Sequence, residues 1–181
     1  MIRSLPFVFL LLAPLVGCST SLETHPGISA FEPGTYRVGG SSSLGFRNDD
    51  IASTKTDTLS ASLDVGKLFW KQIELGARLA YDSVDTGASD TTSQTLLLFL
   101  RYYTVNIGSL RPWLEVGTGY TSVDLAGSNN QDGFPIAVGL GATQFVTDDV
   151  ATEFGVRLSS VGLDTVNRDL TEWFLGLAVF F

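Results

Sequence analysis

The 181-residue sequence contains few of the residues that most often carry chemistry. It has one cysteine, Cys18, and one histidine, His25. A single cysteine cannot form an intrachain disulfide. His25 lies in a segment, residues 19–33, that has two prolines and no hydrophobic periodicity, which is typical of a solvated linker. The composition therefore excludes a disulfide framework and argues against serine–histidine catalysis in the rest of the chain.

Positive charge is also scarce. Eleven Lys and Arg stand against nineteen Asp and Glu, which gives a net charge of −8. Loss of residues 1–17 would remove only Arg3, leaving ten basic against nineteen acidic residues and a charge of −9. Proteins that bind nucleic acid carry a basic footprint. We therefore expect no nucleic-acid partner.

The amino-terminus has the layout of an export signal. Arg3 precedes the short apolar stretch LPFVFLLLAPLV, and small residues follow. The stretch LVGC (15–18) resembles the lipobox of bacterial lipoproteins, in which the cysteine becomes the first mature residue and carries acyl chains. We expect a signal peptide over residues 1–17, lipidation at Cys18 and a tether over 18–33. An ordinary signal peptide followed by an incidental cysteine is the alternative.

From Tyr36 onward, apolar residues recur at every second position in eight segments of about ten residues, each bounded by small or polar residues. This period predicts β-strands, and no helical period interrupts it. A single all-β domain is therefore expected over residues 34–181. The apolar positions are Tyr36, Val38, Leu44, Phe46; Leu59, Ala61, Leu63, Val65; Ile73, Leu75, Ala77, Leu79, Tyr81; Leu96, Leu98, Leu100, Tyr102; Leu114, Val116, Tyr120; Phe134, Ile136, Val138, Leu140, Ala142; Phe154, Val156, Leu158; Trp173, Leu175, Leu177, Val179 and Phe181.

The connections between these segments alternate in length. Short turns at one end and longer polar loops at the other are typical of an outer-membrane barrel. The last segment, WFLGLAVFF (173–181), is too short for a membrane helix, which needs roughly 20 residues, but suits a transmembrane strand. The short connections lie near 67–72, 105–111 and 146–150, and the longer ones near 47–56, 82–93, 122–132 and 161–170.

Periodicity alone does not decide whether the apolar face points outward to lipid or inward to a soluble core. Three observations favour lipid: an export signal, a second face rich in Gly and Ser as a narrow lumen requires, and aromatic residues at segment ends, as in interfacial girdles. We expect one girdle at Tyr36, Trp70, Tyr102, Trp113 and Phe181, and the other at Phe46, Tyr81, Tyr120, Phe134 and Trp173.

The polar face carries four arginines and four carboxylates. Buried charges persist when they are paired, and the donor fork of arginine suits a carboxylate. We expect these residues to form a structural plug of ion pairs in the short-turn half, below a polar recess formed by Ser41, Ser43, Ser60, Gly119 and Gly139. A selectivity ring or a proton path is the alternative. The charged residues are Arg37, Arg78, Arg101 and Arg157 with Asp64, Glu74, Glu115 and Glu153.

Two stretches, RPWLEVGTGY (111–120) and IAVGLGATQFVTDDVATEFGVRLSSV (136–161), resemble the small outer-membrane β-barrel domain family of OmpA/OmpX-type proteins. The resemblance covers residues 34–181 and implies an eight-stranded antiparallel up-and-down transmembrane β-barrel in the bacterial outer membrane. The final alternation, with Trp173 and Phe181, is similar to the signal by which the barrel-assembly machinery recognises such chains. Outer-membrane lipids, lipopolysaccharide and that machinery are the implied partners.

We therefore expect a non-enzymatic, monomeric barrel for envelope integrity or surface interaction, without cofactor or metal. The aspartate-rich loops, among them SNNQDG (128–133), lack the full spacing and closing glutamate of a calcium loop, so a solvated rim is expected. Two alternatives remain. One is a narrow pore for ions or small solutes, and the other is a periplasmic lipoprotein with a lipocalin-like barrel whose apolar face points inward.

Overall fold

The computed structural model describes residues 29–49, 55–85, 90–125, 130–163 and 167–181. The expected signal peptide, Cys18 and most of the expected tether lie outside these residues. In the described part of the chain, no helix is long and apolar enough to cross a membrane. A short 3-10 helix, η2 (Ser29–Phe31), precedes strands β1 (Tyr36–Asp49), β2 (Lys55–Trp70), β3 (Ile73–Asp85), β4 (Asp90–Tyr103), β5 (Leu110–Leu125), β6 (Gln131–Phe145), β7 (Val150–Leu163) and β8 (Asn167–Phe180).

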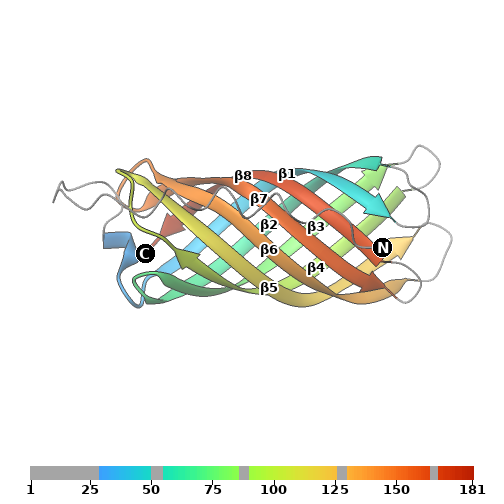
Figure 1. The fold of residues 1–181 in the computed structure, drawn as a ribbon, viewed down its shortest axis with the longest axis horizontal. Coiled ribbons are helices and arrows are strands. Elements are labelled where there is room, and N and C mark those ends of the chain that lie inside the picture. Colours follow the sequence, from blue (N-terminus) through green and yellow to red (C-terminus); the bar gives the residue numbers. More distant parts are fainter. Residues whose placement is uncertain (1–28, 50–54, 86–89, 126–129, 164–166) are drawn as a thin grey trace, which may run out of the picture.

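The strands form a closed barrel in which each pairs antiparallel with the next and β8 pairs back with β1 (Figure 1). This confirms the predicted eight-stranded antiparallel architecture. The strands are 13 to 16 residues long, more than the ten or so suggested by apolar alternation. Backbone pairing does not require apolar side chains, so the β3–β4 ladder continues through polar residues to Asp85 opposite Asp90.

The apolar face points outward. Leu98 and Leu177 in mid-strand are 59% and 61% exposed, whereas Arg37 and Arg101 on the other face are fully buried in the lumen. A soluble barrel would show the reverse distribution. The lipocalin-like alternative, which required the apolar positions inside, is therefore wrong. The outward band of Leu, Val and Ile is the surface that a bilayer core would cover.

Trp113 does not belong to the outer girdle, so that expectation is wrong. Its side chain is 1% exposed and lies in the lumen, where its ring stacks on Phe174 with centroids 5.8 Å apart. Every second residue of a strand lies on the same face, and Trp113 therefore shares the inward face of β5 with Arg111 and Glu115. The other aromatic residues expected in the girdles whose side chains are described are all exposed, namely Tyr36, Trp70, Tyr102 and Phe181 at one end and Tyr81, Tyr120, Phe134 and Trp173 at the other.

An aromatic cluster fills the short-turn end of the barrel, and η2 supplies part of it. Phe31 is 3% exposed, with its ring centroid 4.7 Å from that of Tyr103 and 5.5 Å from that of Phe145. The Arg111 guanidinium lies 3.5 Å from the Phe31 ring centroid. Although Ala30 and Phe31 fall within the expected tether, they pack inside the barrel mouth. The cluster comprises Ala30, Phe31, Leu68, Tyr103, Trp113, Phe145, Ala151, Phe174, Ala178 and Phe180.

Candidate functional site

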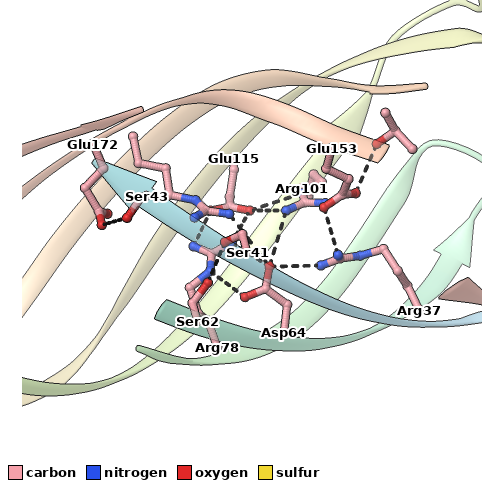
Figure 2. A network of polar contacts seen from close by, with 12 residues as sticks. Arg37, Ser41, Ser43, Ser62, Asp64, Arg78, Arg101, Glu115, Glu153 and Glu172 are labelled. Carbon is pink, nitrogen blue, oxygen red and sulfur yellow. Dashed lines mark hydrogen bonds and ion pairs between the residues drawn. The ribbon is translucent and has the colours of Figure 1, made fainter. Parts of the chain in front are cut away.

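The structure brings the eight predicted lumen charges together in one cluster in the short-turn half of the barrel, and most of them are labelled in Figure 2. All occupy inward positions of their strands, and all are at most 5% exposed. Strand register sets several of the contacts, because it places Asp64 opposite Arg78 and Arg101 opposite Glu115. The residues come from β1 (Arg37), β2 (Asp64), β3 (Glu74, Arg78), β4 (Arg101), β5 (Glu115) and β7 (Glu153, Arg157).

One part of the cluster centres on Glu153 of β7. Arg37 Nη1 donates to Glu153 Oε2 at 3.0 Å, and Arg101 Nη1 donates to Glu153 Oε1 at 2.9 Å. Thr143 Oγ1 adds a third donor at 3.0 Å. The Arg37 Nε also donates to Glu74 Oε1 at 2.8 Å. Glu153 thus accepts bonds from residues on β1, β4 and β6, so these contacts reach across the lumen.

The other part centres on Glu115 of β5. Arg78 donates to both of its oxygens, with Nη1 at 2.7 Å from Oε1 and Nη2 at 2.9 Å from Oε2. Arg101 Nη2 donates to Oε2 at 2.8 Å. Arg78 Nε also donates to Asp64 Oδ1 at 2.6 Å. Arg78, Arg101 and Arg37 each bridge two carboxylates, an arrangement that keeps buried charges compensated.

Three inward aromatic rings line the cluster, and none of them was expected in the lumen. The Arg78 guanidinium lies 5.0 Å from the Phe99 ring centroid, and that of Arg101 lies 4.2 Å from the Trp113 ring. The Phe174 ring lies 3.8 Å from the Arg157 guanidinium. Such contacts stabilise buried cations. The alternation of side chains along a strand could have predicted these inward positions, because Phe99 and Phe174 each lie between two outward residues, of β4 and β8 respectively.

Arg157 is the most loosely paired member. Its Nε is 3.6 Å from Glu115 and its Nη2 is 3.7 Å from Asp64, and neither atom makes a hydrogen bond. The side chain is nevertheless buried. It lies at the boundary between the ion-pair cluster and the loop-side half of the lumen, where it lines a cavity.

This cavity, the loop-side recess, has a volume of about 90 Å³. The five residues expected to form a recess do not line it. Ser41 instead hydrogen-bonds Ser62 at 2.7 Å, and Ser43 donates to Glu172 at 2.9 Å. The recess lies between strands β3 to β8 and is lined by Arg78, Ala80, Asp82, Thr91, Ser93, Thr95, Leu97, Thr121, Val123, Pro135, Ala137, Arg157, Ser159, Val161, Arg168, Leu170 and Glu172.

The residues expected to form the assembly signal lie apart from the lumen. Trp173 faces outward at the middle of β8, and Phe181 faces outward just past its last residue. The Phe181 backbone closes the seam with β1, because Tyr36 N donates to Phe181 O at 2.8 Å and Phe181 N to Tyr36 O at 2.9 Å. Asp82, which was expected in an acidic loop, points into the lumen and accepts a bond from Ser93 at 3.0 Å. Part of SNNQDG, residues 128 and 129, lies outside the described residues.

The cluster has little capacity for acid–base or metal chemistry. Among the described residues, no group of three or more His, Cys, Asp or Glu side chains could hold a metal ion. The only histidine in the sequence, His25, lies outside them. Glu74, Glu115 and Glu153 each accept hydrogen bonds from arginines. The arrangement is suited to filling and bracing the lumen.

No protein-family model matches the chain, and no curated protein matches its sequence. Solved structures do match its fold. Neisserial surface protein A has a TM-score of 0.73 at 15% identity, with 81% of this chain and 98% of that chain covered. The attachment invasion locus protein Ail of Yersinia pestis has 0.54 at 14%, with 82% and 99% covered. The outer membrane enzyme PagL has 0.53 at 14%, with 77% and 98% covered. The fold is that of the small outer-membrane β-barrels.

Proposed function

We propose that this chain is a non-enzymatic barrel of the bacterial outer membrane that serves envelope integrity or surface interaction and has a closed lumen. The proposal rests on one observation. The outer wall of the barrel is apolar, whereas the four arginines and four carboxylates inside it balance one another in charge. An apolar wall this extensive needs a bilayer around it. The charges of the cluster compensate one another and include no free catalytic group, so the cluster does not indicate that a substrate reacts there.

Two layers support closure of the lumen. Eight strands leave an interior just wide enough for side chains to fill. The ion pairs cross the lumen in its short-turn half, and the aromatic cluster around Phe31 fills the short-turn mouth. The pore alternative would require both layers to separate, and the bridging contacts of Arg37, Arg78 and Arg101 oppose this.

Catalysis is not part of the proposal, although the outer membrane enzyme PagL shares the fold. A fold hosts different functions, so the side chains must decide. The described lumen has no histidine that could activate a serine. Ser41 contacts Ser62, while Ser43 and Ser93 donate to the carboxylates of Glu172 and Asp82. This composition supports a structural or binding role.

A surface role is supported by the polar residues at the loop end of the barrel. Two proteins of the same fold carry names that state such roles, a surface protein and an attachment invasion locus protein. We propose a monomeric barrel that contacts outer-membrane lipids and lipopolysaccharide, is inserted by the barrel-assembly machinery through the segment ending at Phe181, and is lipidated at Cys18.

Fractionation tests the location. We expect the protein to remain with outer membranes after carbonate extraction and to migrate differently before and after boiling in mild-detergent gels, because a closed barrel resists the detergent until heated. Release into the soluble fraction, with no heat-dependent shift and no need for detergent after Cys18→Ala, would contradict the proposal. Metabolic labelling with a fatty acid, with Cys18→Ala as the control, tests the lipid anchor separately.

A further inference from the structure

A groove crosses the outer wall of the barrel toward the loop end, over strands β2 to β5, and has a volume of about 620 Å³. Ala61 lies opposite Tyr81 in the ladder, and its small side chain leaves space beside the tyrosine ring. Tyr81 and Tyr120 line this outer groove and are 49% and 44% exposed. Sites for small ligands have volumes of roughly 300–1,000 Å³. The outer groove is therefore large enough to hold part of a lipid molecule.

Strand register arranges the outward lining residues of the outer groove in two rows. The row nearer the loops contains Tyr81, Gln94 and Ser122, which are consecutive neighbours in the ladder. Each of these three side chains can donate a hydrogen bond. The row nearer the short turns is mainly apolar and consists of Leu63, Leu79, Leu96 and Tyr120. The outer groove thus joins a polar end to an apolar end, and tyrosines lie where such a boundary meets the membrane interface.

The charges near the outer groove exclude recognition of a phosphate. Among the described residues, none that lines the groove is charged. Two outward residues next to its polar row, Asp124 and Asp132, are acidic and would repel an anion. The polar row therefore suits an uncharged acceptor. The ester or amide carbonyl of a lipid is such an acceptor, and it lies between the head group and the acyl chain.

We propose that the outer groove binds one acyl chain of a lipid in the loop-side leaflet. The carbonyl of the lipid accepts hydrogen bonds from Gln94 and Ser122, and the chain lies along Leu63, Leu79 and Leu96. This inference rests on the proposed membrane location and names one lipid site within it. Lipid tails are as apolar as leucine, so burial of the chain gives little preference for one lipid over another. The hydrogen bonds to the carbonyl therefore decide which lipid is retained.

Native mass spectrometry of the barrel in detergent micelles tests this with two lipids that differ only in their linkage. They are dimyristoyl phosphatidylcholine and its diether analogue, which has the same head group and chain length but no carbonyl. We expect one molecule of the ester lipid to be retained, with an affinity about threefold or more above that of the diether, as one or two hydrogen bonds imply. Dimyristoyl phosphatidylglycerol, with an anionic head group, should bind no more tightly than the phosphatidylcholine.

Matched variants locate the site. Ala61→Leu fills the outer groove and should weaken binding of the ester lipid about fivefold, because the chain loses its contacts. Ala77→Leu adds the same atoms to the outward face of β3 outside the groove and should leave binding unchanged. Gln94→Leu and Ser122→Ala should lower the affinity for the ester lipid toward that for the diether. Ser160→Ala, which alters an exposed serine of β7 outside the groove, is the control.

The heat-dependent gel shift of each preparation verifies that the barrel is folded. A folded barrel that retains no lipid would therefore overturn the lipid site without affecting the proposed location. Equal affinity for the ester and diether lipids, or tighter binding of the phosphatidylglycerol, would also overturn it, as would unchanged binding by Ala61→Leu. A dimer that forms as the lipid is lost would assign the outer groove to a second copy of the chain instead.

Discussion

At the residue scale, Arg78 shows what the lumen charges do. Its guanidinium donates to Asp64 on β2 and to both oxygens of Glu115 on β5, and it lies above the Phe99 ring. The side chain is buried. Arg78 therefore joins strands that are not neighbours in the barrel, and its removal leaves two carboxylates with less compensation.

We expect Arg78→Ala to lower the free energy of unfolding by about 3–5 kcal/mol, the cost of leaving a buried charge without its partner. Urea titration of the folded barrel in detergent or vesicles measures the change. Lys71→Ala, at an exposed turn position, is the control and should change stability by less than about 0.5 kcal/mol. A loss below about 1 kcal/mol for Arg78→Ala would show that the cluster does not brace the barrel.

Outward residues allow a second test of orientation. Val138 lies in mid-strand and is 47% exposed on the apolar face, opposite Val116 and Leu158 in the ladder. Val138→Arg should cost about 2–4 kcal/mol if it meets the bilayer midplane. Asp132→Arg, outward at the loop end of the same strand, should cost about 0–1 kcal/mol. Equal effects for the two variants in lipid vesicles would place Val138 outside the hydrocarbon region.

At the element scale, the alternating pattern predicted eight strands and which residues face inward, because a period of two depends only on local backbone geometry. It did not predict where strands end, since pairing continues through polar residues such as Asp85 and Asp90. It also misplaced Trp113, whose residue type suggested a girdle although its parity with Glu115 indicated the lumen. Contacts between strands distant in the sequence, such as Arg101 with Glu153, depend on barrel closure and had no pairwise signal.

The docking of η2 had no sequence signal either, because one aromatic residue in a linker does not specify a partner. We expect Phe31→Ala to detach residues 29–31 from the mouth while the strands stay paired, since the Phe31 ring contacts Tyr103, Phe145 and Phe180. Hydrogen exchange should become faster at Gly34, whose N–H bonds Leu68 O, but not in mid-strand. Glu32→Ala, at an exposed position, is the control. Unchanged exchange at Gly34 would contradict this role.

The final strand element combines structure and assembly. Phe181 is 70% exposed and its ring stacks on Tyr36, but its two bonds to β1 are made by backbone atoms. Phe181→Ala should therefore keep the seam and change unfolding free energy by about 1 kcal/mol or less, while lowering the yield of inserted barrel in cells. Phe154→Ala, an outward phenylalanine of β7, is the control for loss of an exposed ring. Normal insertion of Phe181→Ala would exclude the assembly role.

At the scale of the whole molecule, the account depends on a barrel that is apolar outside, charged inside and closed along its axis. The outer wall follows from the alternating sequence, and closure follows from two separate layers, the ion pairs around Glu115 and Glu153 and the aromatic cluster around Phe31. The loop-side recess lies above the first layer and ends on Arg78 and Arg157. A molecule built in this way should not let solutes pass.

Planar-bilayer recording of the purified, unmutated barrel tests this closure most directly. Folding of the same preparation is first verified by its heat-dependent gel shift. We expect a silent membrane, because Arg37, Arg78 and Arg101 hold the lumen closed through bonds of 2.6 to 3.0 Å to carboxylates on other strands. Stable, reproducible channel steps from the unmutated protein would contradict the closed lumen and support the narrow pore instead.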